Sequence, residues 1–379
     1  MALSPEVCIR GGGIVGRTLA LLLARERVRV ALVAPVAEAR DDVRAYALNA
    51  ASKALLESLR AWPDAACATP VREMQVDGDA GGRVRFSAQA QQVDALAWIV
   101  DVPAFERRLA DAVRFQPQID IVDAPVAAAL TVVCEGKASA TREALGVTYD
   151  VTRYPQHAIA ARLEAERPHE GIARQWFDAR GDVLALLPLG GKPESRDLAL
   201  VWSVDQLRAP ELLAQDAEGF GAALRAASGD ALGTITLNSE RASWPLQRAV
   251  ADRWIGRFPP DADGRPGRAW ALAGDAAHTV HPLAGQGLNL GLADAAALAE
   301  VIKTRDYWRD VGDARLLRRY ERARRTDVLS MSLATDGLQQ LFSNGMEPLP
   351  AIRNWGMRGF DRSRLVKRWI AQQAMGLHL

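Results

Sequence analysis

The sequence predicts an α/β fold with a discontinuous Rossmann-like domain, an inserted mixed-sheet domain and C-terminal helices. Two observations carry most of this prediction. A glycine-rich turn lies between an apolar strand and a helix near the N-terminus, and a second strand–turn–helix unit lies in the last third of the chain. Between them are β-rich segments separated by glycine and proline. With 379 residues the chain exceeds one simple core, so two interlocked domains are expected.

The N-terminal unit is predicted to be strand, turn, helix and strand. Residues 7–9 are a short apolar run typical of a buried strand, residues 18–24 have the composition of a packed helix, and residues 28–33 form a second apolar run. The glycine-rich stretch 11–16 lies between the first strand and the helix. In this context it predicts dinucleotide binding rather than a purely structural turn.

The glycines of this turn have separate physical roles. Gly11 permits a tight turn, Gly13 lets the backbone approach a pyrophosphate, and Gly16 lets the helix pack closely on the strand. Backbone N–H groups at the start of the helix favour phosphate. We therefore expect a dinucleotide to contact Gly11, Gly13, Ile14, Val15 and Gly16.

One expected part of such a site is missing. An acidic residue normally ends the second strand and binds a ribose hydroxyl. Here Ala34 occupies that place and is followed by Pro35. Glu38 and Arg40 are nearby, but their spacing is wrong for a simple replacement. The sequence therefore predicts reduced affinity for the adenosine side of a dinucleotide.

The C-terminal unit is also predicted to be strand, turn and helix. Residues 269–273 form the strand, and Gly274 and Asp275 end it with a carboxylate that can accept hydrogen bonds from a ribityl hydroxyl. The loop 282–287 is rich in small residues, so a flat ring could lie against its backbone. A helix from near Leu288 would point its positive N-terminal end at the pyrimidine edge of that ring and stabilise a reduced flavin. Two such units at opposite ends of the chain indicate one extended flavin dinucleotide.

The C-terminal turn allows other interpretations. Asp275, His278 and His281 recur at a spacing of three and could be metal ligands, but no helix is predicted to place them on one face. For His278 alone, a structural histidine that orients the loop through hydrogen bonds is favoured over a catalytic role.

The stretch 11–16 and the motif 274–291 resemble class A flavoprotein monooxygenases, and more closely the ubiquinone-biosynthesis hydroxylases of that class. The resemblance spans nearly the whole chain, and the motif 274–291 is its most specific part. Weaker supporting stretches are 44–52, 95–101, 173–177, 186–189, 200–203, 318–322 and 373–376.

The resemblance implies a fold like that of p-hydroxybenzoate hydroxylase, with bound FAD. NADH or NADPH would be the reductant and O2 the co-substrate, and a flavin hydroperoxide would hydroxylate the ring of a polyprenylated phenol. It places Arg44 near the flavin and Asp275 on the ribityl chain. The cofactor contacts implied in the C-terminal motif are Gly274, Asp275, Pro282, Gly285, Gly287, Leu288 and Asn289. No catalytic residue is identified.

The chain departs from the family pattern in four places. Ala34 replaces the ribose acid, residues 134–136 read Cys-Glu-Gly instead of Ala-Asp-Gly, and Val102 stands where an amide is common. Residues 115–129 are too few for the small antiparallel sheet usually found there. These departures predict weak or exchangeable binding of FAD.

Domain boundaries follow from the same pattern. Expected strands at 83–87, 173–177, 183–188 and 198–203 and a covering helix at 212–226 belong to the insert. The expected FAD-binding domain takes residues 1–70, 95–150 and 265–330, the substrate domain takes 71–94 and 151–264, and a C-terminal helical segment takes 331–379.

Composition limits the partners and the compartment. The 47 basic and 46 acidic residues nearly balance, so no nucleic-acid-binding field is expected. Three cysteines without a C-x-x-C motif fit a reducing cytoplasm. The start of the chain does not resemble a signal peptide, and no apolar run approaches the roughly 20 residues that span a bilayer.

The C-terminal stretch is basic. Arginines cluster over 315–325 and again over 353–368. A solvated helix face is the expectation for such a run. The alternative is peripheral contact with the inner face of an anionic membrane, or with a partner protein of a quinone-synthesis complex.

Three functions stay open. The first is hydroxylation of a polyprenyl phenol. The second is hydroxylation of a small soluble phenol or aromatic acid, for which Arg85 and Arg174 lie on suitable strands. The third is a weakly FAD-binding scaffold subunit. The ring position, the prenyl length, the choice between NADH and NADPH and the oligomeric state are not predicted.

Overall fold

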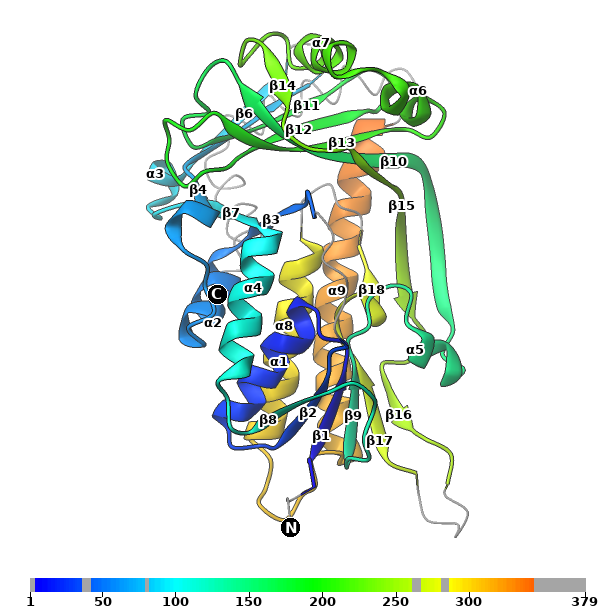
Figure 1. Cartoon of the computed structure of the whole chain (residues 1–379). Helices are drawn as coiled ribbons and strands as arrows, with labels where there is room; N and C mark the ends of the chain where they lie inside the picture. Colours follow the sequence, from blue (N-terminus) through cyan, green and yellow to red (C-terminus); the bar gives the residue numbers. More distant parts are fainter. Residues whose placement is uncertain (1–3, 36–41, 79–81, 261–266, 281–285, 344–379) are drawn as a thin grey trace.

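The computed structural model of the chain describes residues 4–35, 42–78, 82–260, 267–280 and 286–343, with side chains described up to residue 330 (Figure 1). Three sheets organise this part of the chain, with six, nine and three strands. Figure 1 shows most of the nine-stranded sheet at one end of the molecule and the long helices beside the six-stranded sheet at the other, with β10 and β15 running from one end toward the other.

The six-stranded sheet has the order β16-β17-β9-β1-β2-β8. Its strands are parallel except β16, which pairs antiparallel with β17. Strands buried on both faces favour near-continuous apolar runs, and β1 and β9 are such runs. The members are β1 (Val7–Arg10), β2 (Val30–Val33), β8 (Ile119–Val122), β9 (Leu130–Val133), β16 (Ile255–Arg257) and β17 (Ala269–Leu272).

Long helices flank this sheet. α1 packs against both α4 and α8, and α8 packs against α9 (Figure 1). α1 is buried over most of its length, from Ile14 to Ala24, because the whole run 19–24 is apolar. These helices are α1 (Ile14–Arg25), α4 (Val102–Arg114), α8 (Gly287–Lys303) and α9 (Ala314–Ser343). None of the helices in the described chain is both long and apolar enough to cross a membrane.

The nine-stranded sheet has the path β18-β15-β10-β13-β12-β11-β5-β6, with β14 paired to β10. Its outer face carries Ile159, Leu184 and Trp202, which pack with residues of α6 and α7. Its inner face carries the alternate residues along the same strands. The members are β5 (Glu73–Asp77), β6 (Arg83–Ser87), β10 (Tyr149–Ala165), β11 (Ile172–Phe177), β12 (Val183–Pro188), β13 (Asp197–Asp205), β14 (Ile235–Leu237), β15 (Ala242–Ala251) and β18 (His278–Thr279).

The inner face meets a three-stranded sheet of order β3-β7-β4. Ala173 and Ala199 of the large sheet share one apolar cluster with Ala45 and Ala47 of β3. The members are β3 (Ala45–Leu48), β4 (Ala68–Val71) and β7 (Ala97–Asp101); the short helices α2 (Ala50–Ser58), α3 (Ala88–Gln91) and α5 (Ala140–Ala144) follow β3, β6 and β9.

The strands expected at 83–87 and 183–188 match β6 and β12 residue for residue. The expected shortness of 115–129 is also confirmed, because that segment forms β8 alone and β8 joins the main sheet beside β2.

The single helix expected at 212–226 is wrong. The structure has two helices there, α6 (Arg208–Ala214) and α7 (Ala217–Ala227). Gln215 between them is extended, and the side chain of Asp216 accepts a hydrogen bond of 2.8 Å from the Gly219 N–H. Asp216 thereby caps a new helix, and this capping favours a break over continuation.

Candidate cofactor and active site

The glycine-rich turn has the geometry that its spacing predicts. A Cβ on Gly11, whose φ is +121°, would lie 2.3 Å from the Cys134 carbonyl oxygen. A Cβ on Gly16 would lie 1.9 Å from the Gly11 carbonyl oxygen. A Cβ on Gly13 would meet no described atom within 4 Å. Gly11 and Gly16 therefore allow close packing, and Gly13 borders open space at the start of α1.

Two helices begin at this site without a side-chain cap. α1 starts after Gly13 and α8 after Gln286; neither N-terminus has a capping side-chain hydrogen bond or an acidic residue in its first turn, as far as the described residues go. Their first N–H groups and positive dipole ends are thus available to an anionic or electron-rich group.

Val15 brings the two sequence motifs together. A Cβ on Gly274 would lie 3.2 Å from a methyl carbon of Val15, and a Cβ on Gly291 would lie 2.8 Å from the same carbon. Gly274 also has a φ of +62°, which favours glycine. The start of α1 therefore meets the turn after β17 and α8, although Val15 is 259 residues from Gly274 and 276 residues from Gly291 in the chain.

Asp275 stands exposed at that turn, within the electrostatic reach of Arg44. Although the residue is exposed, the surrounding protein limits hydration of its carboxyl group and so raises its pKa. The charges of His278, Lys137 and Arg44 oppose this rise. The Tyr149 hydroxyl donates a hydrogen bond of 2.8 Å to the Asp275 carbonyl oxygen. An exposed carboxylate on a held backbone suits a hydroxyl-bearing ligand.

Arg44 is held by its neighbours on the strand side of the site. Its Nε donates to Asp42 Oδ1 at 2.9 Å, and its Nη1 donates to the Tyr46 hydroxyl at 3.1 Å. Burial raises the pKa of the Asp42 carboxyl, but its hydrogen bonds and charge interaction with Arg44 outweigh burial and lower the pKa overall. Arg44 therefore remains a fixed positive charge near Asp275.

Asn289 ties the start of α8 to β3 and α2. Its Oδ1 accepts hydrogen bonds from the Asn49 N–H at 3.0 Å and from the Ser52 hydroxyl at 2.7 Å. Its Nδ2 donates to the Ala47 carbonyl oxygen at 2.8 Å. The side chain of Asn289 is thus occupied by the protein, and any part it has in cofactor binding lies in its backbone or in positioning α8.

A buried ion cluster beneath the turn was not predicted. The Gly274 N–H and His278 Nε2 both contact Asp294 Oδ2, at 2.8 and 2.7 Å, and Arg324 Nε donates to Asp294 Oδ1 at 2.8 Å. The exposed fractions of Asp294 and His278 are 0 and 1%. Burial would raise the pKa of Asp294, but His278 and Arg324 outweigh it and hold the pKa below its ordinary value.

This cluster supports the structural interpretation of His278, whose ring stacks on Trp254 with centroids 5.0 Å apart. It also corrects the expectation that the basic run 315–325 is a solvated face throughout, because Arg324 is buried in an ion pair. The available signal was an aspartate at position 294 within the otherwise apolar stretch 290–299 of α8.

The departure at 134–136 has a structural account. The longer side chain of Glu135 accepts hydrogen bonds from the hydroxyls of Ser139 and Thr141 at 2.7 and 2.6 Å, and it pairs with Arg10 at 3.1 Å. Burial raises the pKa of Glu135, but the bonds from Thr141 and Ser139 outweigh it and lower the pKa overall. Glu135 therefore anchors the start of α5 to the end of β1.

At the expected adenosine side, the described residue directly after β2 is Ala34, which has no polar side chain. A Cβ on Gly12 would lie 2.4 Å from the Cβ of Ala34, so Ala34 packs directly against the glycine-rich turn. Glu38 and Arg40 lie outside the described residues, as do His281, Pro282 and Gly285. Among the described residues no group of His, Cys, Asp and Glu could hold a metal ion.

The arginines considered for an acidic substrate lie on the outer face of the large sheet. Arg174 pairs with Leu186 of the outer cluster, and Gln75 pairs with both Arg174 and Arg85. Directly paired residues share a face. Arg162 does reach the inner side, but it pairs with Asp101 at 2.8 Å and donates to the Arg44 carbonyl oxygen.

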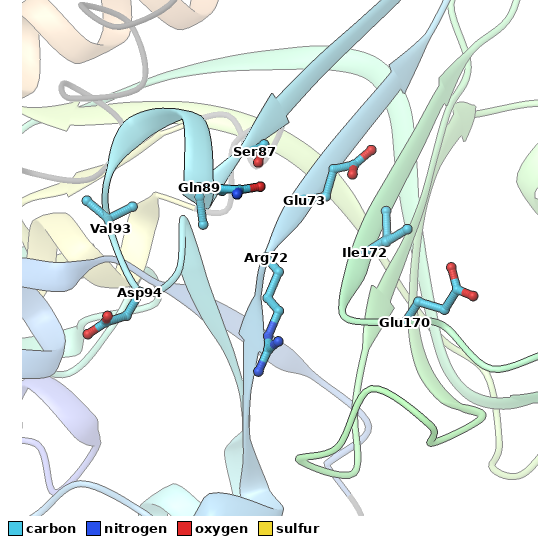
Figure 2. Close-up of a pocket in the computed structure, with 9 residues that line it drawn as sticks. Arg72, Glu73, Ser87, Gln89, Val93, Asp94, Glu170 and Ile172 are labelled. Carbon is cyan, nitrogen blue, oxygen red and sulfur yellow. The ribbon is translucent and has the colours of Figure 1, made fainter.

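A surface recess of about 510 Å³ lies at the β5–β6 edge of the large sheet, as Figure 2 shows. No residue expected to bind the cofactor lines it. Its charged lining residues are Arg72 and the carboxylates Glu73, Asp94 and Glu170, so it is a polar surface feature separate from the site.

Comparisons with known proteins show which family the chain belongs to. A family model described as "FAD binding domain" matches residues 114–331. The ubiquinone hydroxylase UbiL of Rhodospirillum rubrum is 33% identical, over 98% of this chain and 89% of that protein. The 3-demethoxyubiquinol 3-hydroxylase of Escherichia coli is 30% identical, over 98% of each chain.

Solved structures show the same fold. The p-nitrophenol 4-monooxygenase PnpA of Pseudomonas putida superposes with a TM-score of 0.77 at 18% identity, covering 99% of each chain. PqsL of Pseudomonas aeruginosa, in complex with 2-aminobenzoylacetate, gives a TM-score of 0.72 at 22% identity, over 94% of this chain and 99% of that one.

Fold and site thus define an FAD-dependent aromatic-ring monooxygenase. Within that class, the chain belongs to the ubiquinone-biosynthesis FAD hydroxylase family. FAD, when bound, supplies the redox and oxygen chemistry with NAD(P)H as electron donor, and the protein supplies binding, orientation and exclusion of water. The open space at Gly13 and the two uncapped helix starts fit such a cofactor.

Proposed function

We propose that this protein hydroxylates the aromatic ring of a polyprenylated phenol in ubiquinone biosynthesis. The observation that carries the substrate class is the inner face of the large sheet, where Ala185, Leu187 and Val201 are partly exposed. An apolar wall favours a greasy substrate through burial of its hydrocarbon. The relatives described above are named a ubiquinone hydroxylase and a 3-demethoxyubiquinol 3-hydroxylase.

The position of the arginines favours this substrate over a small aromatic acid. Arg85 and Arg174 are directed to the other face of the sheet, and Arg162 is neutralised by Asp101. None of these three arginines is therefore placed to neutralise a carboxylate on the substrate.

Cofactor binding within this proposal uses the residues expected from the sequence. The pyrophosphate would lie at the turn 11–16, Asp275 would bind the ribityl chain, and the start of α8 at Gly287 and Leu288 would lie along the pyrimidine edge. Gly274 and Asn289 would shape that end, and Arg44 would add positive charge. The corresponding domain division is 1–70, 95–150 and 265–330 for FAD, and 71–94 and 151–264 for the substrate.

The substrate class gives a reason for contact with a membrane. A polyprenyl tail partitions into lipid, so we propose peripheral association with the inner face of the membrane, with a quinone-synthesis complex as the wider setting. The exposed arginines 315, 318, 319 and 322 on α9 are the supporting feature. Reduced sedimentation with anionic vesicles after their replacement by glutamine would support the contact; unchanged sedimentation would contradict it.

The test is turnover of the FAD-loaded protein with matched phenols. We expect a prenylated phenol to stimulate NAD(P)H oxidation with formation of hydroxylated product, and a short-chain phenol to do so far less. Peroxide as the sole oxygen product with every phenol would contradict the proposal. In cells, Asp275→Ala should block the pathway; an intact pathway would favour a scaffold role instead.

A further inference from the structure

One row of residues crosses the inner face of the large sheet and contains a single polar side chain. Strand pairing sets six residues side by side, one from each of six neighbouring strands. They are Ala160, Val201, Ala185, Gln175, Val76 and Val84. Gln175 on β11 is therefore an isolated amide in an apolar row.

The neighbouring row shows which way Gln175 faces. Ala173, two residues earlier on β11, packs in the apolar cluster with Ala45 and Ala47 of β3. The carbonyl oxygen of Ala47 accepts the hydrogen bond from Asn289 at the start of α8. Since residues two apart on a strand share a face, Gln175 lies on the side of the sheet that is turned toward the cofactor end of the molecule.

The middle of this row is partly exposed, whereas the opposite face of β12 and β13 is buried. Gln175, Ala185 and Val201 are partly exposed, while Leu184, Leu186 and Leu200 on the opposite face are buried. Within the described chain, the Gln175 amide has no hydrogen-bond partner. A ring bound over this wall would remove water from the amide, and that loss costs free energy unless the ligand replaces the hydrogen bond, so a ligand with an oxygen atom at this point is favoured.

We propose that Gln175 orients the substrate: its side-chain amide donates a hydrogen bond to an oxygen substituent of the aromatic ring. Ala185 and Val201 contact the apolar edge of the same ring. Because the rest of the row is apolar, this one hydrogen bond determines which ring carbon faces the flavin. This inference rests on the proposed function, because it takes an oxygen-bearing aromatic ring as the ligand.

The chain offers a matched control on the next strand. Gln75 is paired with Arg174 and therefore lies on the outer face, where its amide donates to Glu73 at 2.8 Å. Gln75→Leu removes the same kind of side chain from the same sheet without changing the inner face. Gln175→Glu keeps the size of the side chain and replaces its donor with an acceptor.

The experiment compares wild type, Gln175→Leu, Gln175→Glu and Gln75→Leu, all loaded with FAD, using a prenylated phenol. We expect both Gln175 variants to lose about 5- to 10-fold in kcat/KM, the scale of one hydrogen bond, and to release more peroxide per NAD(P)H oxidised. FAD affinity, measured by flavin fluorescence, and Tm should match wild type. Gln75→Leu should match wild type in every readout.

The outcomes separate the two proposals. If wild type hydroxylates the phenol and the Gln175 variants behave like Gln75→Leu, this inference alone is overturned. If wild type yields no hydroxylated product with any prenylated phenol, the proposed function and this inference fall together. A loss of FAD affinity or a lower Tm in both Gln175 variants, with coupling unchanged, would show a structural role and would also overturn the inference.

Discussion

The two ends of the proposed cofactor site differ in how firmly the protein fixes them. At the ring end, Asp294 holds the backbone of Gly274, and Asn289 fixes the start of α8. At the adenosine end, Ala34 stands where an acid is expected and adds no hydrogen bond from its side chain. The difference teaches that affinity for FAD should be concentrated at the ring and ribityl end, with the adenosine end contributing less.

The largest effect should come from Asp294→Ala. It leaves Arg324 buried without its main partner, and breaking a buried pair in this way costs about 3–5 kcal/mol. We expect the free energy of unfolding in urea to fall by that amount and FAD binding to weaken with it. Asp327→Ala is the control, because Asp327 also pairs with Arg324 but is 49% exposed. Its effect should be below about 1 kcal/mol; equal effects of the two variants would contradict the account.

The same cluster predicts a pH dependence. The folded protein depresses the pKa of Asp294, so its contribution to stability is present above the unfolded pKa of about 3.9 and is lost as pH falls through the folded pKa. The stability gap between wild type and Asp294→Asn should therefore shrink as the pH falls through the folded pKa of Asp294. Urea unfolding at pH values from 7 downward measures the gap, and a gap as large at the acid end as at pH 7 would be inconsistent with the ion pairs.

A smaller pair of effects distinguishes packing from ligand space in the N-terminal turn. Gly16→Ala forces a methyl group onto the Gly11 carbonyl oxygen, so stability should fall by about 1–3 kcal/mol. Gly13→Ala meets no described atom, so stability should hold while FAD affinity drops about tenfold. Thermal unfolding without FAD and flavin fluorescence titration separate the two. If Gly13→Ala left FAD affinity unchanged, the result would contradict phosphate binding at this turn.

The smallest effect is a gain at the weak end. Ala34→Glu restores a carboxylate where a ribose hydroxyl could be bound, and we expect FAD affinity to rise about three- to tenfold. Ala34→Gln, which keeps the length without the charge, should gain less. Unchanged affinity in both variants would mean that other residues already serve the adenosine end.

The sequence predicted those features whose signal is local. The glycine turn, β6 and β12 depend on spacing and alternation over a few residues, and the structure has them. The break at 215–216 had a local signal too, because Asp216 stands three residues before Gly219, but helix periodicity on both sides masked it.

The partners of Asp294 could not be predicted, because only the tertiary fold brings them together. His278 lies 16 residues before Asp294 and Arg324 lies 30 residues after it, on a different helix. Likewise, the face on which Arg174 lies depends on pairing with β12, and a strand assignment alone leaves that open.

The most direct test of the central claim follows the oxygen atom. FAD-loaded protein, NAD(P)H and a prenylated phenol are incubated under ¹⁸O₂, and the product is weighed by mass spectrometry. The account predicts one labelled oxygen on the aromatic ring for each coupled NAD(P)H oxidised. Hydroxylated product without the label, or peroxide with no hydroxylated product, would contradict it.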